Sequence, residues 1–320
     1  MRTRSTAPRW ALTALSVDTP VSMSTTTEPK SVLVAGATGR LGLVVELLLA
    51  RGHRVRAMTR EVRSRHAAHL RELGAETVFG DFDDVASITA AARGVDALFA
   101  TGTAHRSGPA GEERHGRNLA DAAAAARVGH FVYSSGEGAA ESSSLPLFQA
   151  KFRVEEHIRS LPLPHTILAP VYFMENLFNP WNLPALRAGK LPSPIAVDAP
   201  LQQVAIADVA AFATLAIERP DEFASKRVPL ASDELNAVEA ADAMSRVVGR
   251  RLVTEQISAY ALAPGLRFLF AWLERVGHDV DIGALRRGHP QIGWHDYEGW
   301  LSSQRARLGG LCASREPVVR

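Results

Sequence analysis

The chain has 320 residues, of which 46% are hydrophobic and 22% are charged, and its formal net charge is +2. These values are ordinary for a globular protein, and the length suffices for one large α/β domain or for a core domain with a smaller lobe. The near-neutral charge gives no reason to expect a nucleic-acid partner. The single cysteine, Cys312, excludes an internal disulfide and a zinc site built from cysteines, which fits a reducing compartment.

Residues 1–29 differ from the rest because they are rich in Ser, Thr and Arg and poor in acidic residues. We expect a disordered tail, or an extension that arises from a start site placed before Met23, in preference to a targeting peptide. The most apolar later stretch, 259–273, is broken by Pro264, Gly265 and Arg267, which favours an amphipathic helix over a membrane span. The sequence therefore predicts a soluble, cytoplasmic protein without a membrane partner.

From residue 31 onward, short apolar runs alternate with longer helical patterns. The runs predicted as strands are 31–36, 54–60, 75–81, 95–101, 130–135 and 165–170. Strands that alternate with helices of this length indicate βαβ units and a parallel sheet with helices on both faces. The sequence therefore predicts an α/β fold, with a doubly wound Rossmann core over residues 30–170.

After Pro170 the pattern changes, because residues 179–200 contain five prolines and must be mostly loop. Later segments read again as short strands and helices, and 226–232 is a candidate strand that could return to the core. We expect residues 171–320 to form a smaller C-terminal α/β lobe, for substrate or for interaction, over the carboxyl ends of the main strands.

The glycine-rich stretch "VAGATGRLG", residues 34–42, follows a predicted strand and opens a predicted helix. In this context Gly36 allows a tight turn, Gly39 lets the backbone approach a pyrophosphate, and Gly42 lets helix and strand pack closely. The first amides of the helix then point at the phosphates. The expected cofactor contacts of this loop are Gly36, Thr38, Gly39, Arg40, Leu41 and Gly42.

The end of the second strand bears on the choice between NAD and NADP. NAD binders usually place an acid there for the ribose 2′-hydroxyl, whereas this chain has Thr59 and Arg60, followed by Arg63. A guanidinium suits a 2′-phosphate, because it can bind phosphate through two hydrogen bonds. We therefore expect NADP(H) as the preferred cofactor, with NAD(H) as an alternative, and Arg60 as the residue that contacts the phosphate.

Several motifs together resemble the NmrA-like branch of the atypical short-chain dehydrogenases. They are "VAGATGRLG", "MTR", "GDFDD", "YSSG", the lysine at 151 followed by "VEEHIRS", and "HTILAPVYFMENL", within residues 31–179. The resemblance implies an NADP(H)-binding protein. It also implies these contacts: Asp81 and Phe82 beside the adenine; Thr101, Gly102 and Thr103 along the cofactor; Ser134 near the nicotinamide; Lys151 near its ribose; and Pro170, Val171, Tyr172 and Phe173 closing over the nicotinamide end.

The catalytic pattern departs from ordinary short-chain dehydrogenases, which use Tyr-x-x-x-Lys and take the proton for the carbonyl oxygen from the tyrosine. Here the stretch is "FQAK", so Phe148 stands where the tyrosine would be, and Lys151 remains. Lys151 could itself act as acid or base, Tyr133 or Tyr172 could supply a phenol from another direction, or a quinone could accept a hydride without a protein acid. We take Lys151 as the candidate catalytic residue, although a role in ribose binding alone stays open.

Other candidates carry less weight. His105 and His115 lack a carboxylate at ligand spacing, so no metal is expected. Glu155 and Glu156 are neighbours that diverge on a helix, which indicates a solvated face. Trp181 and the other tryptophans of the C-terminal part are expected to pack the small lobe or to line its pocket.

The most direct functional hypothesis is a reductase of a small hydrophobic quinone or carbonyl substrate. The rival is a non-catalytic NADP(H) redox sensor that acts through a protein partner, and the missing tyrosine favours this rival. An isomerase or epimerase of a nucleotide sugar is a weaker alternative, because it too would need the tyrosine. The oligomeric state is not fixed by the sequence.

Overall fold

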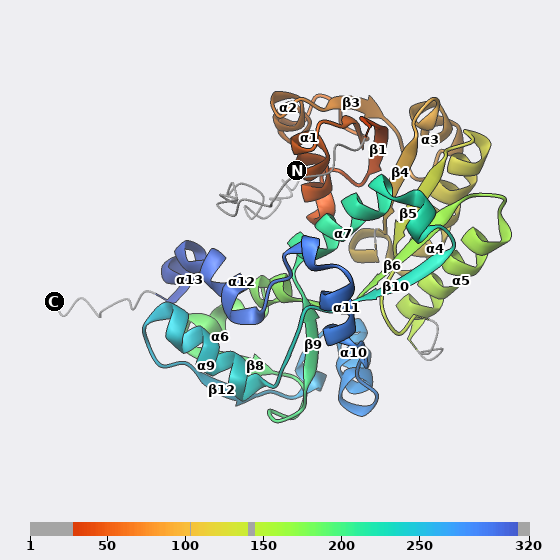
Figure 1. Ribbon diagram of the computed structural model, residues 1–320. Helices are drawn as coiled ribbons and strands as arrows, with labels where there is room; N and C mark the ends of the chain where they lie inside the picture. Colours follow the sequence, from red (N-terminus) through yellow and green to blue (C-terminus); the bar gives the residue numbers. More distant parts are fainter. Residues whose placement is uncertain (1–27, 103, 140–144, 313–320) are drawn as a thin grey trace, which may run out of the picture.

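The computed structural model describes residues 28–102, 104–139 and 145–312 (Figure 1). In this part of the chain, seven parallel strands form the central sheet in the order β10-β6-β5-β4-β1-β2-β3. The strands are β1 (Ser31–Ala35), β2 (Arg54–Thr59), β3 (Glu76–Phe79), β4 (Ala97–Thr101), β5 (His130–Ser134), β6 (His165–Pro170) and β10 (Lys226–Leu230). The six strands expected from the sequence are thus confirmed, and the fold is a doubly wound Rossmann fold with a smaller C-terminal α/β lobe.

Helices cover both faces of the sheet, as Figure 1 shows. One face packs against α1 (Leu43–Ala50), α2 (Arg65–Glu72) and α7 (Ile206–Glu218), and the other against α3 (Val85–Ala92), α4 (Ala104–Ala125) and α5 (Pro146–Ser160). Every residue of β1, β5 and β6 is buried, as expected for parallel strands covered on both sides. Helix α4 is kinked at Gly108, where φ is 64°, and Pro109 follows as a residue well suited to start the next helical turn.

The chain returns to the sheet after it has entered the small lobe. Helix α7 packs on α1, and β10 pairs in parallel with β6 at the edge of the sheet, with Lys226 opposite Thr166. The short helix α8 (Pro220–Phe223) connects them. Residues 206–230 therefore pack with the central sheet, although they lie within the range 171–320 that was expected to form the smaller lobe.

The small lobe lies beside the carboxyl ends of the strands (Figure 1). Its described strands form a three-stranded sheet in the order β11-β9-β7 and the pair β12-β8. These strands are β7 (Tyr172–Phe173), β8 (Lys190–Ser193), β9 (Leu201–Val204), β11 (Asp233–Leu235) and β12 (Val253–Gln256). The helices are α6 (Leu183–Arg187), α9 (Ala237–Val248), α10 (Pro264–Arg275), α11 (Ile282–Gly288), α12 (Tyr297–Ser303) and α13 (Arg305–Cys312).

Short 3₁₀ turns join these elements: η1 (Arg40–Gly42), η2 (Met174–Phe178), η3 (Ala259–Ala261) and η4 (Pro290–Ile292). Local sequence explains several boundaries. Asp84 accepts hydrogen bonds from the first amides of α3, and Asn236 with Glu239 forms a capping box on α9.

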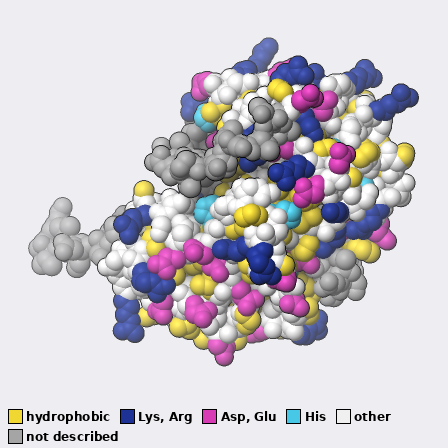
Figure 2. Space-filling model, viewed as in Figure 1, with side chains coloured by type: hydrophobic (Ala, Val, Ile, Leu, Met, Phe, Trp, Pro, Cys, Tyr) yellow, Lys and Arg dark blue, Asp and Glu magenta, His cyan; other side chains and the backbone are white. Residues whose placement is uncertain are grey.

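The surface carries both signs of charge. Figure 2 shows Lys and Arg side chains interspersed with Asp and Glu across the viewed face. Among the described helices, none is long and apolar enough to cross a membrane.

Candidate cofactor and substrate site

The glycine loop between β1 and α1 is sterically restricted at each of its glycines. Gly36 has a φ of +83°, and a Cβ there would lie 2.7 Å from Thr101 Cγ2. A Cβ on Gly39 would lie 3.1 Å from the Gly36 carbonyl oxygen, and one on Gly42 would overlap the carbonyl oxygen of Ala37. The tight turn expected at Gly36 therefore has a direct geometric counterpart, whereas the atom that excludes a Cβ at Gly42 belongs to the loop itself.

The loop then begins the first helix with the turn η1. The Gly39 amide donates to the Gly36 carbonyl at 2.8 Å, which closes the loop before Arg40 and Leu41 begin the turn. The first amides of a helix have no partner within it, so they are available to an anion. The Leu41 side chain packs into the core, which leaves its backbone as the group that can face a ligand.

The loop lies where the strand order reverses. Strand β1 pairs with β2 on one side and with β4 on the other, and consecutive connections run in opposite directions from this point. In open α/β sheets, ligands bind in the crevice outside the carboxyl ends of the strands at such a position. The crevice beside Gly36 is therefore the candidate cofactor site.

On the β2–β3 side of this crevice lie the residues expected to contact the adenosine half. Arg60 follows β2 directly, is exposed, and has no side-chain partner among the described residues. The Asp81 carboxylate accepts from the amide of Asp83 at 3.1 Å. The Phe82 ring packs edge-on against His115 at 5.7 Å, which fixes the turn between β3 and α3.

On the other side lie the ends of β4, β5 and β6. Thr101 is opposite Ser134, and Ser134 is opposite Leu168, so these strand ends form one edge. Ser134, Pro170 and Val171 are buried, and Phe173 is partly buried. Thr103 lies outside the described residues, so its expected contact stays a prediction.

Lys151 has a partner that sequence reasoning missed. Its Nζ atom lies 2.7 Å from Oε1 of Glu112, which stands on α4 and is fully buried, while the lysine side chain is only 13% exposed. The Glu112 carboxylate lies directly against Gly102, where a Cβ would overlap it. The two groups form an ion pair where α4 and α5 meet. No local pattern marks Glu112, because α4 and α5 come together only through the fold.

Phe148 occupies an apolar environment. Its ring meets Trp272 of α10 edge-on, with centroids 5.5 Å apart, and Trp272 also covers Gly138. On the same helix as Phe148, Lys151 passes close to Gly136, whose Cβ position lies 3.5 Å from Lys151 Cδ. Position 148, where ordinary short-chain dehydrogenases have the tyrosine, therefore holds a ring that packs against another aromatic side chain.

The two tyrosines considered as alternative acids lie in different environments. Tyr133 is fully buried beneath α4 and α5, its hydroxyl has no hydrogen-bond partner within the described chain, and burial, followed by Glu112 and Glu155, raises its pKa well above the ordinary value. It is therefore enclosed by protein. Tyr172 instead lines a cavity in the small lobe.

The solvated face expected for Glu155 is wrong. Glu155 is fully buried and accepts from the Ser135 hydroxyl at 2.6 Å, from Arg159 at 2.7 Å and from Arg227 at 3.1 Å. Because β10 brings Arg227 back to the sheet, a buried carboxylate gains a cationic partner that the local helix pattern could not reveal. Glu156, its neighbour, is exposed as expected.

Arg40 connects the glycine loop to the segment after β7. Its guanidinium donates to Asn176 Oδ1 at 2.8 Å and to Asn179 Oδ1 at 2.9 Å, and burial lowers its pKa. The next carboxylate, Glu175, accepts from the amide of Ile206 and from the indole of Trp300. Burial raises the pKa of Glu175 to about 7. The loop and the small lobe are therefore held together by polar contacts.

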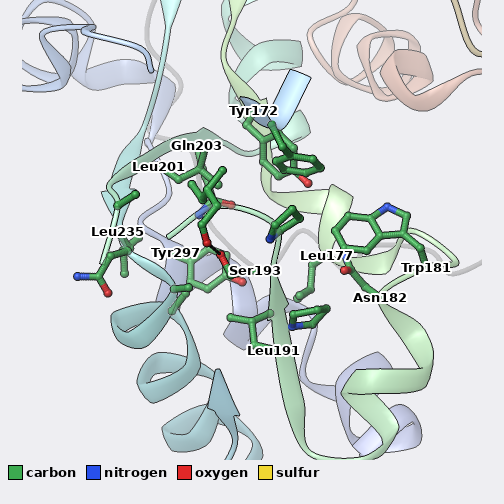
Figure 3. Close-up of a pocket in the computed structure, with 18 residues that line it drawn as sticks. Tyr172, Leu177, Trp181, Asn182, Leu191, Ser193, Leu201, Gln203, Leu235 and Tyr297 are labelled. Carbon is green, nitrogen blue, oxygen red and sulfur yellow. Dashed lines mark hydrogen bonds between the residues drawn. The ribbon is translucent and has the colours of Figure 1, made fainter. Parts of the chain in front are cut away.

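A cavity of about 80 Å³ lies in the small lobe (Figure 3). Tyr172, Trp181 and Asn182 stand on one side in this view, with Leu201, Gln203 and Tyr297 across from them. The rings of Tyr172 and Trp181 each lie about 6 Å from that of Phe270 on α10, at 6.0 and 5.9 Å. Trp181 therefore lines the pocket, as the sequence indicated.

Comparison with known proteins gives a consistent family. A family model described as the NmrA-like family matches residues 28–271. The photosystem II assembly factor Ycf39 of Trieres chinensis is 31% identical over 161 residues, which are 49% of this chain and 50% of that protein. The chain thus matches only about half the length of this relative. The (4-alkanoyl-5-oxo-2,5-dihydrofuran-3-yl)methyl phosphate reductase of Streptomyces griseus subsp. griseus is 31% identical over 236 residues, 73% of this chain and 80% of that protein.

Solved structures share the fold. The negative transcriptional regulator NmrA in complex with NADP superposes with a TM-score of 0.70 at 24% identity, over 86% of this chain and 94% of that one. The NADPH-dependent quinone oxidoreductase of Escherichia coli, complexed with NADPH, has a TM-score of 0.72 at 23% identity, over 87% of this chain and 99% of that one.

Proposed function

The chain belongs to the NmrA-like family, and on that premise we propose that it binds NADP(H) and reduces a small hydrophobic quinone or carbonyl compound. The observation that carries the cofactor half is the loop Gly36–Gly42 at the switch point, where Gly36 and Gly42 leave no room for a Cβ and the first helical turn begins. The pyrophosphate would lie against this loop.

The preference for NADP(H) follows from Arg60. Its exposed guanidinium has no side-chain partner in the described chain, and the end of β2 offers no acid to the ribose 2′-hydroxyl. The 2′-phosphate would bind Arg60. NAD(H) would bind through the same loop without this contact.

The rest of the cofactor would extend along the strand ends. The adenine would lie beside Asp81 and Phe82, and the nicotinamide half beside Thr101, Gly102 and Ser134. Segment 170–173 would close over the nicotinamide. In this arrangement Lys151, oriented by its ion pair with Glu112, would bind the ribose and would lie beside the reacting oxygen.

The reductase half of the proposal is supported by the environment of the site. The bound nicotinamide supplies the hydride, so the protein must orient it and enclose an acceptor. The cavity next to Tyr172 has aromatic walls and no charged residue in its lining, which suits a small hydrophobic acceptor. One relative is a reductase of an oxo-dihydrofuran compound, and one structural neighbour is a quinone oxidoreductase.

The test is oxidation of NADPH, followed by its absorbance, with a panel of quinones, aldehydes and ketones. We expect turnover above background with at least one member, and a loss of about tenfold or more in kcat/KM for Lys151→Ala. The matched control is Lys226→Ala, which removes a lysine at the amino end of β10 and leaves turnover unchanged. Failure of every acceptor with saturating NADPH bound would contradict the reductase.

The alternative function is a redox sensor that binds NADP(H) and signals to a protein partner. Phe148 favours it, because a phenylalanine packed on Trp272 cannot give a proton at the family's tyrosine position. A regulator of transcription is among the structures with this fold. The sensor predicts tight NADPH binding, no turnover on the panel, and a partner whose affinity differs between NADPH and NADP⁺.

A further inference from the structure

The small-lobe cavity is a half-open pocket lined by elements from several parts of the chain (Figure 3). Its volume of about 80 Å³ is several times the roughly 10–15 Å³ that holds one water, so it has room for more than a single water. None of its lining residues is charged. An ionic ligand would therefore lose its hydration without gaining a counter-charge, which restricts the cavity to neutral ligands.

Hydrogen-bond donors on the wall lack partners. The phenols of Tyr172 and Tyr297 make no hydrogen bond to any described residue, and the indole N–H of Trp181 is buried without a partner there. Burial raises the pKa of both phenols, so they keep their protons across the usual pH range. Both phenols belong to residues that line the same cavity.

Carboxamides of Asn182 and Gln203 also line this wall. Asn182 is only 4% exposed, and its Nδ2 atom donates to the Asn176 carbonyl oxygen at 3.0 Å, which fixes the orientation of the carboxamide. Its Oδ1 atom then has no partner within the described residues. An unpartnered buried polar group costs about 1–3 kcal/mol. A ligand that accepts a hydrogen bond from the Trp181 indole would offset the cost at that group.

We infer that this cavity binds a neutral aromatic carbonyl compound whose oxygen accepts hydrogen bonds from the phenols of Tyr172 and Tyr297. The aromatic side chains of Trp181 and Phe270 suit a planar ring, and the uncharged lining suits a neutral ligand. The unpartnered phenols and the Trp181 indole can donate to a carbonyl oxygen. The inference deepens the proposed reductase, and it rests on that proposal only for the claim that the bound carbonyl is the group reduced.

Tyr172 also connects the cavity with the cofactor crevice. It follows Pro170 and Val171 directly, and Arg40 of the glycine loop donates to Asn176, four residues further along the chain. A carbonyl oxygen held by Tyr172 therefore lies on the side of the cavity nearest the loop. In this position the Tyr172 hydroxyl supplies the hydrogen bond that Phe148 cannot.

The test compares 4-fluoroacetophenone with 1-ethyl-4-fluorobenzene by ¹⁹F NMR titration of the full chain, because these probes differ by C=O against CH₂. We expect the wild type to bind the ketone at least tenfold more tightly. The double variant Tyr172→Phe/Tyr297→Phe, which removes only the two hydroxyls, is expected to reduce that preference to below threefold. The control Tyr260→Phe changes a tyrosine that is 76% exposed and is expected to keep the wild-type preference.

Three results would overturn the inference: equal affinity for both probes in the wild type, no binding of either, or an unchanged preference in the double variant. Trp181→Phe provides a second measurement. It removes the indole N–H donor, so the preference for the ketone over the ethyl compound should fall about threefold. NADPH binding is measured on the same samples by its fluorescence. Ketone binding without NADPH binding refutes the proposed function and leaves the cavity assignment standing. NADPH binding without ketone binding refutes the cavity assignment alone.

Discussion

The buried pair of Glu112 and Lys151 makes a quantitative prediction that needs no substrate. The carboxylate is fully buried, the ammonium is 13% exposed, and the atoms lie 2.7 Å apart. Glu112→Leu leaves a nearly buried cation without this partner, which costs about 3–5 kcal/mol, and Lys151→Met removes the cation from a fully buried carboxylate, which is also destabilising. In the double variant both charges are absent, so we expect it to be less destabilised than either single variant.

The assay is urea unfolding of the four proteins that make up this double-mutant cycle. A favourable coupling energy of about 2 kcal/mol or more is expected. The matched control is the exposed pair of Lys190 and Glu255, whose atoms lie at a similar 2.6 Å, and whose coupling should be at most about 1 kcal/mol. Additive effects of the two buried substitutions would refute the assignment of a tight ion pair in this environment.

Further predictions concern the cofactor site and the link to the small lobe. Gly36→Ala should abolish NADPH binding because its Cβ meets the β4 end, whereas Gly52→Ala, with a similar φ of +82° but open space, should cost about 1–2 kcal/mol of stability and leave binding intact in a fluorescence titration. Arg60→Glu should weaken NADPH at least tenfold more than NADH, with Arg251→Glu as an exposed control, and equal losses for both cofactors would exclude the phosphate contact. Glu175, whose pKa is raised to about 7, binds a proton more tightly in the folded state, so its contribution to stability is present below about pH 4.5 and is lost as pH rises through 7. Glu175→Gln should remove about 2–3 kcal/mol of this pH dependence in urea unfolding, and an unchanged pH profile would contradict the buried carboxylate.

The sequence was most informative where structure is local. The strands up to residue 170 are continuous apolar runs between helical patterns, and the structure has each of them. The tight turn expected at Gly36 agrees with its φ of +83°. The family resemblance is confirmed by the match over residues 28–271.

What the sequence left open depends on contacts between distant segments. Whether β10 returns to the sheet is decided by its pairing with β6, about 60 residues earlier. That return brings Arg227 to Glu155, which is why a helix pattern alone misplaced this glutamate on the surface. The partner of Lys151 and the walls of the small-lobe cavity likewise come from helices and strands that meet only in the folded chain.

The central claim is that one crevice seats a phosphorylated dinucleotide on the Gly36–Gly42 loop and directs its reactive end toward Lys151 and Tyr172. A crystal structure of the chain grown with saturating NADPH tests this most directly. The account predicts pyrophosphate density against the loop amides, the 2′-phosphate at Arg60, and the nicotinamide between Ser134 and the mouth of the small-lobe cavity. A crevice that stays empty, or a nicotinamide turned away from Lys151, would contradict it.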